Sequence, residues 1–211
     1  MKNAAKILIC TFASYIISGC GGSSGDTDST NIPAQVIALQ ESGIVGTWQT
    51  NCRINSNGTS DIGVYRFTET GRIEFEVVSH PNTDCTDEML VISVGGTFQV
   101  GEIVSSEEFG VIREIDRVFT DSFITVHNQS VLDSFNSNGF VCPVAVFELD
   151  VTYDQSNCDG VWDGGRLPVE EFLTFTVIDG TRLVVSVTAS SSDDRVAELD
   201  LSADFRSFDL Q

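Results

Sequence analysis

The sequence predicts an all-β fold: an antiparallel up-and-down barrel of about 8–10 strands, with a β-sandwich as the alternative. Three observations support this fold class. Apolar and polar residues alternate along most of the chain after residue 44, as expected for strands with one wet face. Turn signals separate these runs at intervals of roughly twelve residues. No long amphipathic helical pattern lies between them, which excludes an α/β fold.

The clearest single element is a hairpin. Two β-rich runs flank Asp179-Gly180, a dipeptide that favours a type I′ turn. Further turn signals are Asn57-Gly58, Thr70-Gly71, Gly95-Gly96 and Asn138-Gly139, and a short helical turn is expected at 36–42. The expected strands are 45–53, 62–68, 72–77, 89–94, 97–104, 111–119, 122–127, 145–153, 172–178, 181–187 and 195–202.

Composition excludes several classes of protein. The 211 residues include 31 acids and 11 basic residues, a formal net charge of −20. Both lysines, Lys2 and Lys6, lie at the extreme N-terminus. A nucleic-acid binder that neutralises phosphates needs a basic face, and so does a polybasic membrane-surface binder. The apolar content of 41% is too high for an acidic disordered chain.

The N-terminus carries the pattern of an export signal. Lys2 and Lys6 precede an apolar run over 7–17, which is short for a membrane span. The run ends in Ile17-Ser18-Gly19-Cys20, which resembles the lipobox of bacterial lipoproteins. The resemblance implies cleavage of a signal peptide over 1–19 and acylation of Cys20, with palmitate as a label for the acyl chains. The alternative is an ordinary cleaved signal followed by a stray cysteine.

By analogy with the same family, Gly21 in place of an Asp implies anchoring in the outer membrane of a Gram-negative bacterium. Whether the domain would face the periplasm or the outside is not readable from the sequence. A Gly/Ser/Asp/Thr-rich stretch follows, so residues 20–43 are expected to form the lipidated cysteine and a flexible tether. Residues 44–211 are expected to form a single all-β domain. The expected partners are the membrane, through the lipid anchor, and a small apolar ligand, with no nucleic acid. The domain is expected to be a monomer.

Four cysteines remain in the domain. An even number of cysteines in an exported chain indicates two disulfides, for which three pairings are possible. We favour Cys52–Cys85 and Cys142–Cys158, because each of these pairs closes a local loop. A metal site is the rival interpretation, but no C-x₂-C spacing is present, and His80 and His127 lack ligand spacing to the cysteines or to each other.

Gly46-Thr47-Trp48 at the first expected strand resembles the G-x-W signature of lipocalins. That resemblance implies that Trp48 closes one end of an eight-stranded barrel and that an arginine late in the chain, Arg195 or Arg206, stacks on it. It also implies a small apolar ligand inside the barrel. Thr120-Asp121, in an expected turn, is faintly similar to a second motif of the family, although Ser122 replaces the aromatic residue. The alternative is that Trp48 is simply a core residue.

Two function classes follow, neither catalytic. The first is binding of a small apolar ligand in the barrel, with Trp48 and Trp162 as candidate ligand-binding residues. The second is a structural or adhesive lipoprotein that binds a protein or glycan, with calcium as one option. Trp162 lies between acids in a turn-rich loop and either binds a sugar or cation or covers the barrel mouth. The many carboxylate pairs indicate a solvated acidic surface, and no motif predicts catalytic residues, cofactors or a metal site.

Overall fold

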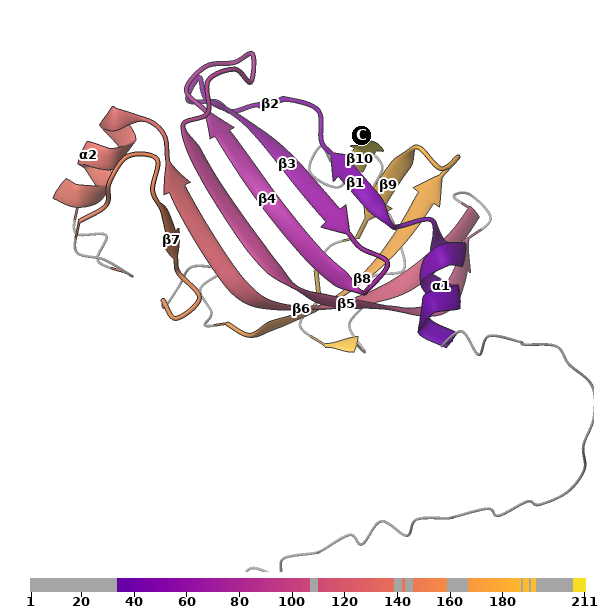
Figure 1. Ribbon diagram of the computed structural model, residues 1–211. Coiled ribbons are helices and arrows are strands. Elements are labelled where there is room, and N and C mark those ends of the chain that lie inside the picture. The colour runs from indigo at the N-terminus through magenta and orange to yellow at the C-terminus, as the bar shows by residue number, and fades with distance from the viewer. Residues whose placement is uncertain are drawn as a thin grey trace, which may run out of the picture. The chain divides into compact units, whose positions relative to one another are not determined.

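Eight antiparallel strands close into a barrel in the computed structural model (Figure 1). The structure describes residues 34–106, 110–138, 142, 146–158, 167–186, 188–189, 191–192 and 207–211. Around the ring the order is β1 (Gly46–Gln49), β3 (Ser60–Phe67), β4 (Arg72–His80), β5 (Leu90–Ser106), β6 (Gly110–Val126), β8 (Val169–Ile178), β9 (Arg182–Val185) and β10 (Ser207–Leu210), and β10 pairs with β1 again. Each strand of the ring therefore pairs with the next along the chain, which is the predicted up-and-down topology.

The strands differ strongly in length. β5 and β6 are 17 residues each and run past the end of β8, where the short β7 pairs with β6 instead. β2 pairs with β3 alone, beside the ring. The remaining elements are α1 Ala34–Ser42, β2 Arg53–Ile54, α2 Gln129–Ser137 and β7 Thr152–Asp154.

The hairpin prediction is confirmed at β8 and β9. Asp179 and Gly180 have φ angles of 51° and 67°, and a type I′ turn requires positive φ at both central residues. The helical turn expected at 36–42 is confirmed as α1. The strand expected at 195–202 lies outside the described residues.

Two expected turns are wrong. Gly95-Gly96 lies inside β5 and Thr120-Asp121 lies inside β6, and both strands continue through a register shift at this point. A Cβ on Gly96 would lie 1.9 Å from the carbonyl oxygen of Val118, so glycine is needed there for the close approach of two backbones. The glycine pair marks a bulge between long strands, not a chain reversal.

A third difference concerns the segment before β7. The strand expected at 145–153 is reduced to Thr152–Asp154, and Phe147 lies outside any strand. The helix α2 was not expected. Asn128 caps it by accepting hydrogen bonds from the backbone N–H groups of Ser130 and Val131. Side chains of α2, β5, β6 and the β7 segment form a second apolar cluster, centred on Ile124, Val126, Leu132 and Phe147.

The helix α1 packs onto the barrel ahead of residue 44, where the sequence placed the start of the domain. Leu39 of α1 belongs to the main core together with Ile44. Glu41 forms an ion pair with Arg113 of β6 at 3.8 Å. Each described helix, α1 and α2, has nine residues, and among the described residues no helix is long and apolar enough to cross a bilayer.

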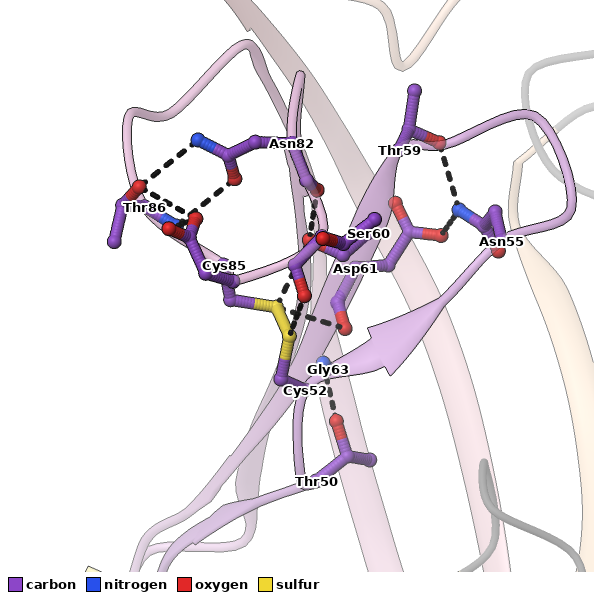
Figure 2. The surroundings of a disulfide bond; sticks show 12 residues. Thr50, Cys52, Asn55, Thr59, Ser60, Asp61, Gly63, Asn82, Cys85 and Thr86 are labelled. Atoms are coloured by element: carbon purple, nitrogen blue, oxygen red, sulfur yellow. Dashed lines mark hydrogen bonds between the residues drawn. A yellow bond between two sulfur atoms is a disulfide. The ribbon is translucent and has the colours of Figure 1, made fainter.

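Both favoured disulfides are confirmed. Cys52 is bonded to Cys85, with a Cα–Cα distance of 5.8 Å, and Cys142 to Cys158, at 5.7 Å. Figure 2 shows the first of these bonds, which joins the segment between β1 and β2 to the loop between β4 and β5. Ser60 of β3 lies beside it and donates its hydroxyl to the carbonyl oxygen of Asn82. The bond therefore holds two neighbouring loops at one end of β3 together.

Candidate functional site

The barrel lumen is the first place to look for a site, because this fold places inward-facing side chains around a common space. Trp48 lies there, on β1, and is 1% exposed. Its indole Nε1–H donates to the carbonyl oxygen of Ile44 at 2.6 Å. Gly46 has a φ of 149°, and a Cβ there would lie 3.0 Å from Leu210. The glycine of the Gly-x-Trp sequence therefore has a local physical reason. Trp48 thus ties the chain before β1 to the barrel interior.

Aromatic rings fill the described part of the lumen. Tyr65 stacks on Phe75 with ring centroids 4.3 Å apart, and Phe67 meets Phe98 edge to face at 5.0 Å. A ligand cavity would leave water-accessible surface on the side chains that line it. The described lumen side chains have little of it. Tyr65, Phe67 and Phe75 are 6%, 3% and 9% exposed. The following large side chains are at most 2% exposed: Trp48, Phe98, Ile115, Phe119, Leu173, Phe175, Leu183 and Phe208. The part of the lumen that the structure describes is therefore packed like a protein core.

One ion pair is buried among these rings. Arg117 of β6 is 4% exposed and Glu171 of β8 is 6% exposed. Nη2 of Arg117 donates to a carboxylate oxygen of Glu171, and Nη1 donates to the hydroxyl of Tyr65 at 2.7 Å. The guanidinium also lies 5.4 Å from the ring centre of Tyr65 and 5.3 Å from that of Phe119. Arg117, Glu171 and Tyr65 are called the lumen ion-pair cluster below.

In the lumen ion-pair cluster, the positive charge of Arg117 is paired with the negative charge of Glu171. Burial acts to lower the pKa of Arg117, but Tyr65 and Glu171 outweigh it and the pKa of Arg117 is raised. The arginine therefore stays charged beside its carboxylate. Within the described residues its Nε atom has no hydrogen-bond partner. An arginine already held by a carboxylate is a poor receptor for another anion, so the cluster is better suited to fixing the core than to binding a charged ligand.

Sequence reasoning missed the lumen ion-pair cluster, although the alternation contained a signal. Arg117 stands between Ile115 and Phe119 at a spacing of two, so it shares their inward face. Glu171 has the same relation to Leu173 and Phe175 of β8. A charged residue at an inward position on each of two adjacent strands is the pattern that could have indicated a buried pair.

The predicted site residues are not all brought together. Trp48 is in the lumen, whereas Trp162, Cys20, Arg195 and Arg206 lie outside the described residues, so the stacking of a late arginine on Trp48 stays a prediction. The described arginine in the lumen is Arg117, which contacts Tyr65 and Phe119.

The two histidines lie apart from the lumen ion-pair cluster. His80 is buried, and neither of its ring nitrogens has a hydrogen-bond partner in the described part of the chain. His127 shares a hydrogen bond of 2.8 Å with Asp150, and Glu88 lies 3.8 Å from its other ring nitrogen. Among the residues that the structure describes, no three His, Cys, Asp or Glu side chains are grouped to hold a metal ion.

The described residues line two pockets on the outer wall, meaning the face of the barrel strands that points away from the lumen. One, of about 280 Å³, crosses β3 to β6, and the other, of about 220 Å³, crosses β5, β6 and β8. The first is lined by Arg66, Thr68, Arg72, Ile73, Glu74, Ser93, Val94, Gly95, Asp121 and Phe123 and is called the outer-wall pocket below. Both pockets mix polar and apolar side chains.

Comparison with known proteins gives no functional lead: no protein-family model matches this chain, and neither does any curated protein. The lumen and the outer wall are therefore the features of the molecule from which a function can be inferred.

Proposed function

We propose that this chain is a lipid-anchored, non-catalytic binding protein of the bacterial outer membrane, whose lipocalin-like barrel recognises its partner through the outer wall. The observation that supports this choice is the packing of the lumen. Its described aromatic side chains are at most 9% exposed, and its buried arginine, Arg117, is already paired with Glu171. A barrel with a filled interior still offers loops and a strand surface for recognition.

The anchor in this proposal is Cys20. A lipoprotein carries several acyl chains, which meets the requirement of more than one signal for stable membrane attachment. Expressed in a Gram-negative host with labelled palmitate, the wild-type chain is expected to incorporate label and Cys20→Ser to lose it. Cys10→Ser is the matched control, because it removes the other cysteine of the signal region, and its labelling is expected to be unchanged. Equal labelling of Cys20→Ser and wild type would contradict the anchor.

The packed-lumen proposal is tested by native mass spectrometry of residues 27–211, exported without Cys20 and purified gently. We expect a bare monomer whose mass does not change on denaturation. An added mass of a few hundred daltons that denaturation removes would contradict the proposal, because such a mass is a bound small molecule of the size that barrel cavities hold.

That contrary outcome would support the second candidate, a small apolar ligand carried inside the barrel. The observation in its favour is the fold itself, since a closed eight-stranded antiparallel barrel is the architecture in which such ligands are held. In this protein the ligand would have to displace rings such as Phe98 and Phe119 from a packed core.

A further inference from the structure

The outer-wall pocket is centred on Gly95 of β5, a residue that has no side chain. Strand pairing places Arg66 of β3, Glu74 of β4, Gly95 of β5 and Asp121 of β6 side by side in one row. All four face outward, because Tyr65, next to Arg66 on β3, points into the lumen toward Arg117. The row thus presents a guanidinium, a carboxylate, a gap and a second carboxylate.

The backbone does not require the gap. A Cβ on Gly95 would lie 3.6 Å from Oδ2 of Asp121, which is ordinary van der Waals contact. Its neighbour Gly96 differs, since a Cβ there would collide with the β6 backbone. Glycine in the middle of a strand weakens that strand, so Gly95 costs stability without a steric reason inside the fold. What its missing side chain provides is the open floor of the pocket.

The walls of the pocket offer hydrogen-bond donors, acceptors and one aromatic side chain. Arg66 lies 3.3 Å from Glu74 and 3.3 Å from Glu76, and these carboxylates raise its pKa against the effect of partial burial. In the part of the chain that the structure describes, the exposed Arg72 side chain makes no ion pair. Phe123 and Ser93 form the next row of the sheet, where they are paired across β5 and β6.

The charges of this pocket restrict the ligand. Two arginines beside carboxylates give the pocket no strong preference for an anionic or a cationic ligand. The guanidinium of Arg66 already pairs with Glu74 and Glu76, the carboxylates that a bound cation would need. The volume of about 280 Å³ is close to the lower end for small-molecule sites, about 300 Å³. A neutral, polyhydroxylated unit with one apolar face fits this description, because hydroxyls pair with both guanidinium and carboxylate groups while C–H groups pack on an aromatic ring.

We propose that the outer-wall pocket binds one sugar unit of a glycan. Glu74 and Asp121 accept hydrogen bonds from sugar hydroxyls, Arg72 and Ser93 donate to sugar oxygens, and Phe123 packs against the apolar face of the ring. This proposal rests on the proposed function, because it names the chemical class of the partner that the outer wall recognises.

The test is a titration of uniformly ¹⁵N-labelled residues 27–211, monitored through the amide chemical shifts. The ligands are the methyl glycosides of glucose, galactose, mannose, N-acetylglucosamine and N-acetylgalactosamine. At least one glycoside is expected to give saturable shifts at Ser93, Gly95 and Phe123. The expected dissociation constant is on the order of 1 mM, as for a ligand of about a dozen non-hydrogen atoms in an open site. No saturable shift with any glycoside at about 50 mM, far above that constant, would overturn the proposal.

Two variants locate the binding. Gly95→Val fills the floor of the pocket and is expected to weaken binding by about tenfold or more through steric conflict. Arg72→Gln removes one donor and is expected to weaken binding about three- to tenfold. Its matched control is Arg182→Gln, which removes the same charge from the outer wall of β9 and is expected to bind like wild type. Glycoside shifts that persist in Gly95→Val, or fall equally in the two arginine variants, would overturn the assignment to this pocket.

The outcome is separable from that of the proposed function. If no glycoside binds while native mass spectrometry gives a bare monomer, the sugar site is wrong and the packed-barrel proposal stands. If a ligand of a few hundred daltons is found and the glycoside shifts at Gly95 also saturate, the outer-wall site stands and the packed-lumen proposal is wrong.

Discussion

Arg117 and Glu171 place two opposite charges among the aromatic and aliphatic side chains of the described lumen. Removing one partner of such a pair leaves an uncompensated buried charge, which typically costs about 3–5 kcal/mol of stability. Glu171→Leu removes the carboxylate that pairs with Arg117 and is therefore expected to lower the free energy of unfolding by about this amount. Arg117→Met removes a cation beside Glu171 and is expected to be destabilising as well. The double variant, which removes both charges, is expected to lose less than Glu171→Leu alone. The measurement is equilibrium unfolding in urea.

The control is an ion pair at the surface. Arg66→Met removes a partner of Glu74 and Glu76, whose side chains are 49% and 22% exposed, and is expected to cost at most about 1 kcal/mol. A double variant as unstable as the sum of its two single variants would show that Arg117 and Glu171 contribute independently, contrary to their pairing.

At this scale the sequence predicted partners well where the chemistry is local and poorly where it depends on packing. The disulfides followed from cysteine number, export and loop length. The burial of Arg117 did not, because alternation assigns a face but not whether an inward charge finds a partner on another strand. Glu171 lies 54 residues away along the chain, and sequence spacing carries no information about such a contact.

At the scale of single elements, Gly95-Gly96 is the instructive error. Consecutive glycines are a turn signal, yet glycine also allows the close backbone approach that a bulge requires. Both conformations use the same property, the absence of a Cβ. The helix α2 was missed for a related reason: Val131, Leu132 and Phe135 have helical spacing, but the run is short and lies between strongly alternating segments.

Alanine substitutions at Gly95 and Gly96 are expected to change the stability of the barrel in opposite directions. Gly96→Ala would place a methyl group 1.9 Å from the carbonyl oxygen of Val118, so it must displace β6 and should cost about 1–3 kcal/mol. Gly95→Ala meets only ordinary contacts and is expected to stabilise the barrel by about 0.5–1 kcal/mol, because alanine loses less backbone entropy on folding. Urea unfolding of both variants checks this, and a loss in Gly95→Ala matching that in Gly96→Ala would contradict it.

At the scale of the whole molecule, the predicted up-and-down barrel is confirmed, but the strand that closes it, β10, was not among the expected strands. Alternation and turn spacing gave antiparallel neighbours along the chain. Closure depends on β1 pairing with β10, and Trp48 lies beside Leu210 on one side and Tyr65 on the other. Whether the lumen is filled or empty could not be predicted from the sequence either. Both kinds of barrel need the same alternating strands, and they differ in how large side chains meet across the interior.

The two disulfides close loops of 33 and 16 residues in this barrel. In the chain-entropy account a disulfide stabilises by restricting the unfolded chain, which gives about 3–4 kcal/mol for loops of this size, with the longer loop ahead by about 0.6 kcal/mol. Replacing Cys52 and Cys85 together by alanine should therefore cost slightly more than replacing Cys142 and Cys158. Urea unfolding of each double variant, against the oxidised wild type, measures both costs.

The native surroundings of the two disulfides differ, so the order of the two stability costs also tests how much native packing contributes. Beside Cys52–Cys85, Ser60 of β3 donates a hydrogen bond to the carbonyl oxygen of Asn82 in the loop that carries Cys85, so part of the arrangement of this loop survives without the disulfide. Cys158 is 3% exposed, and an alanine there leaves unfilled volume in addition to the lost cross-link. If loop entropy dominates, the Cys52/Cys85 variant is the less stable; the reverse order would show that native packing around Cys158 outweighs the restriction of the unfolded chain.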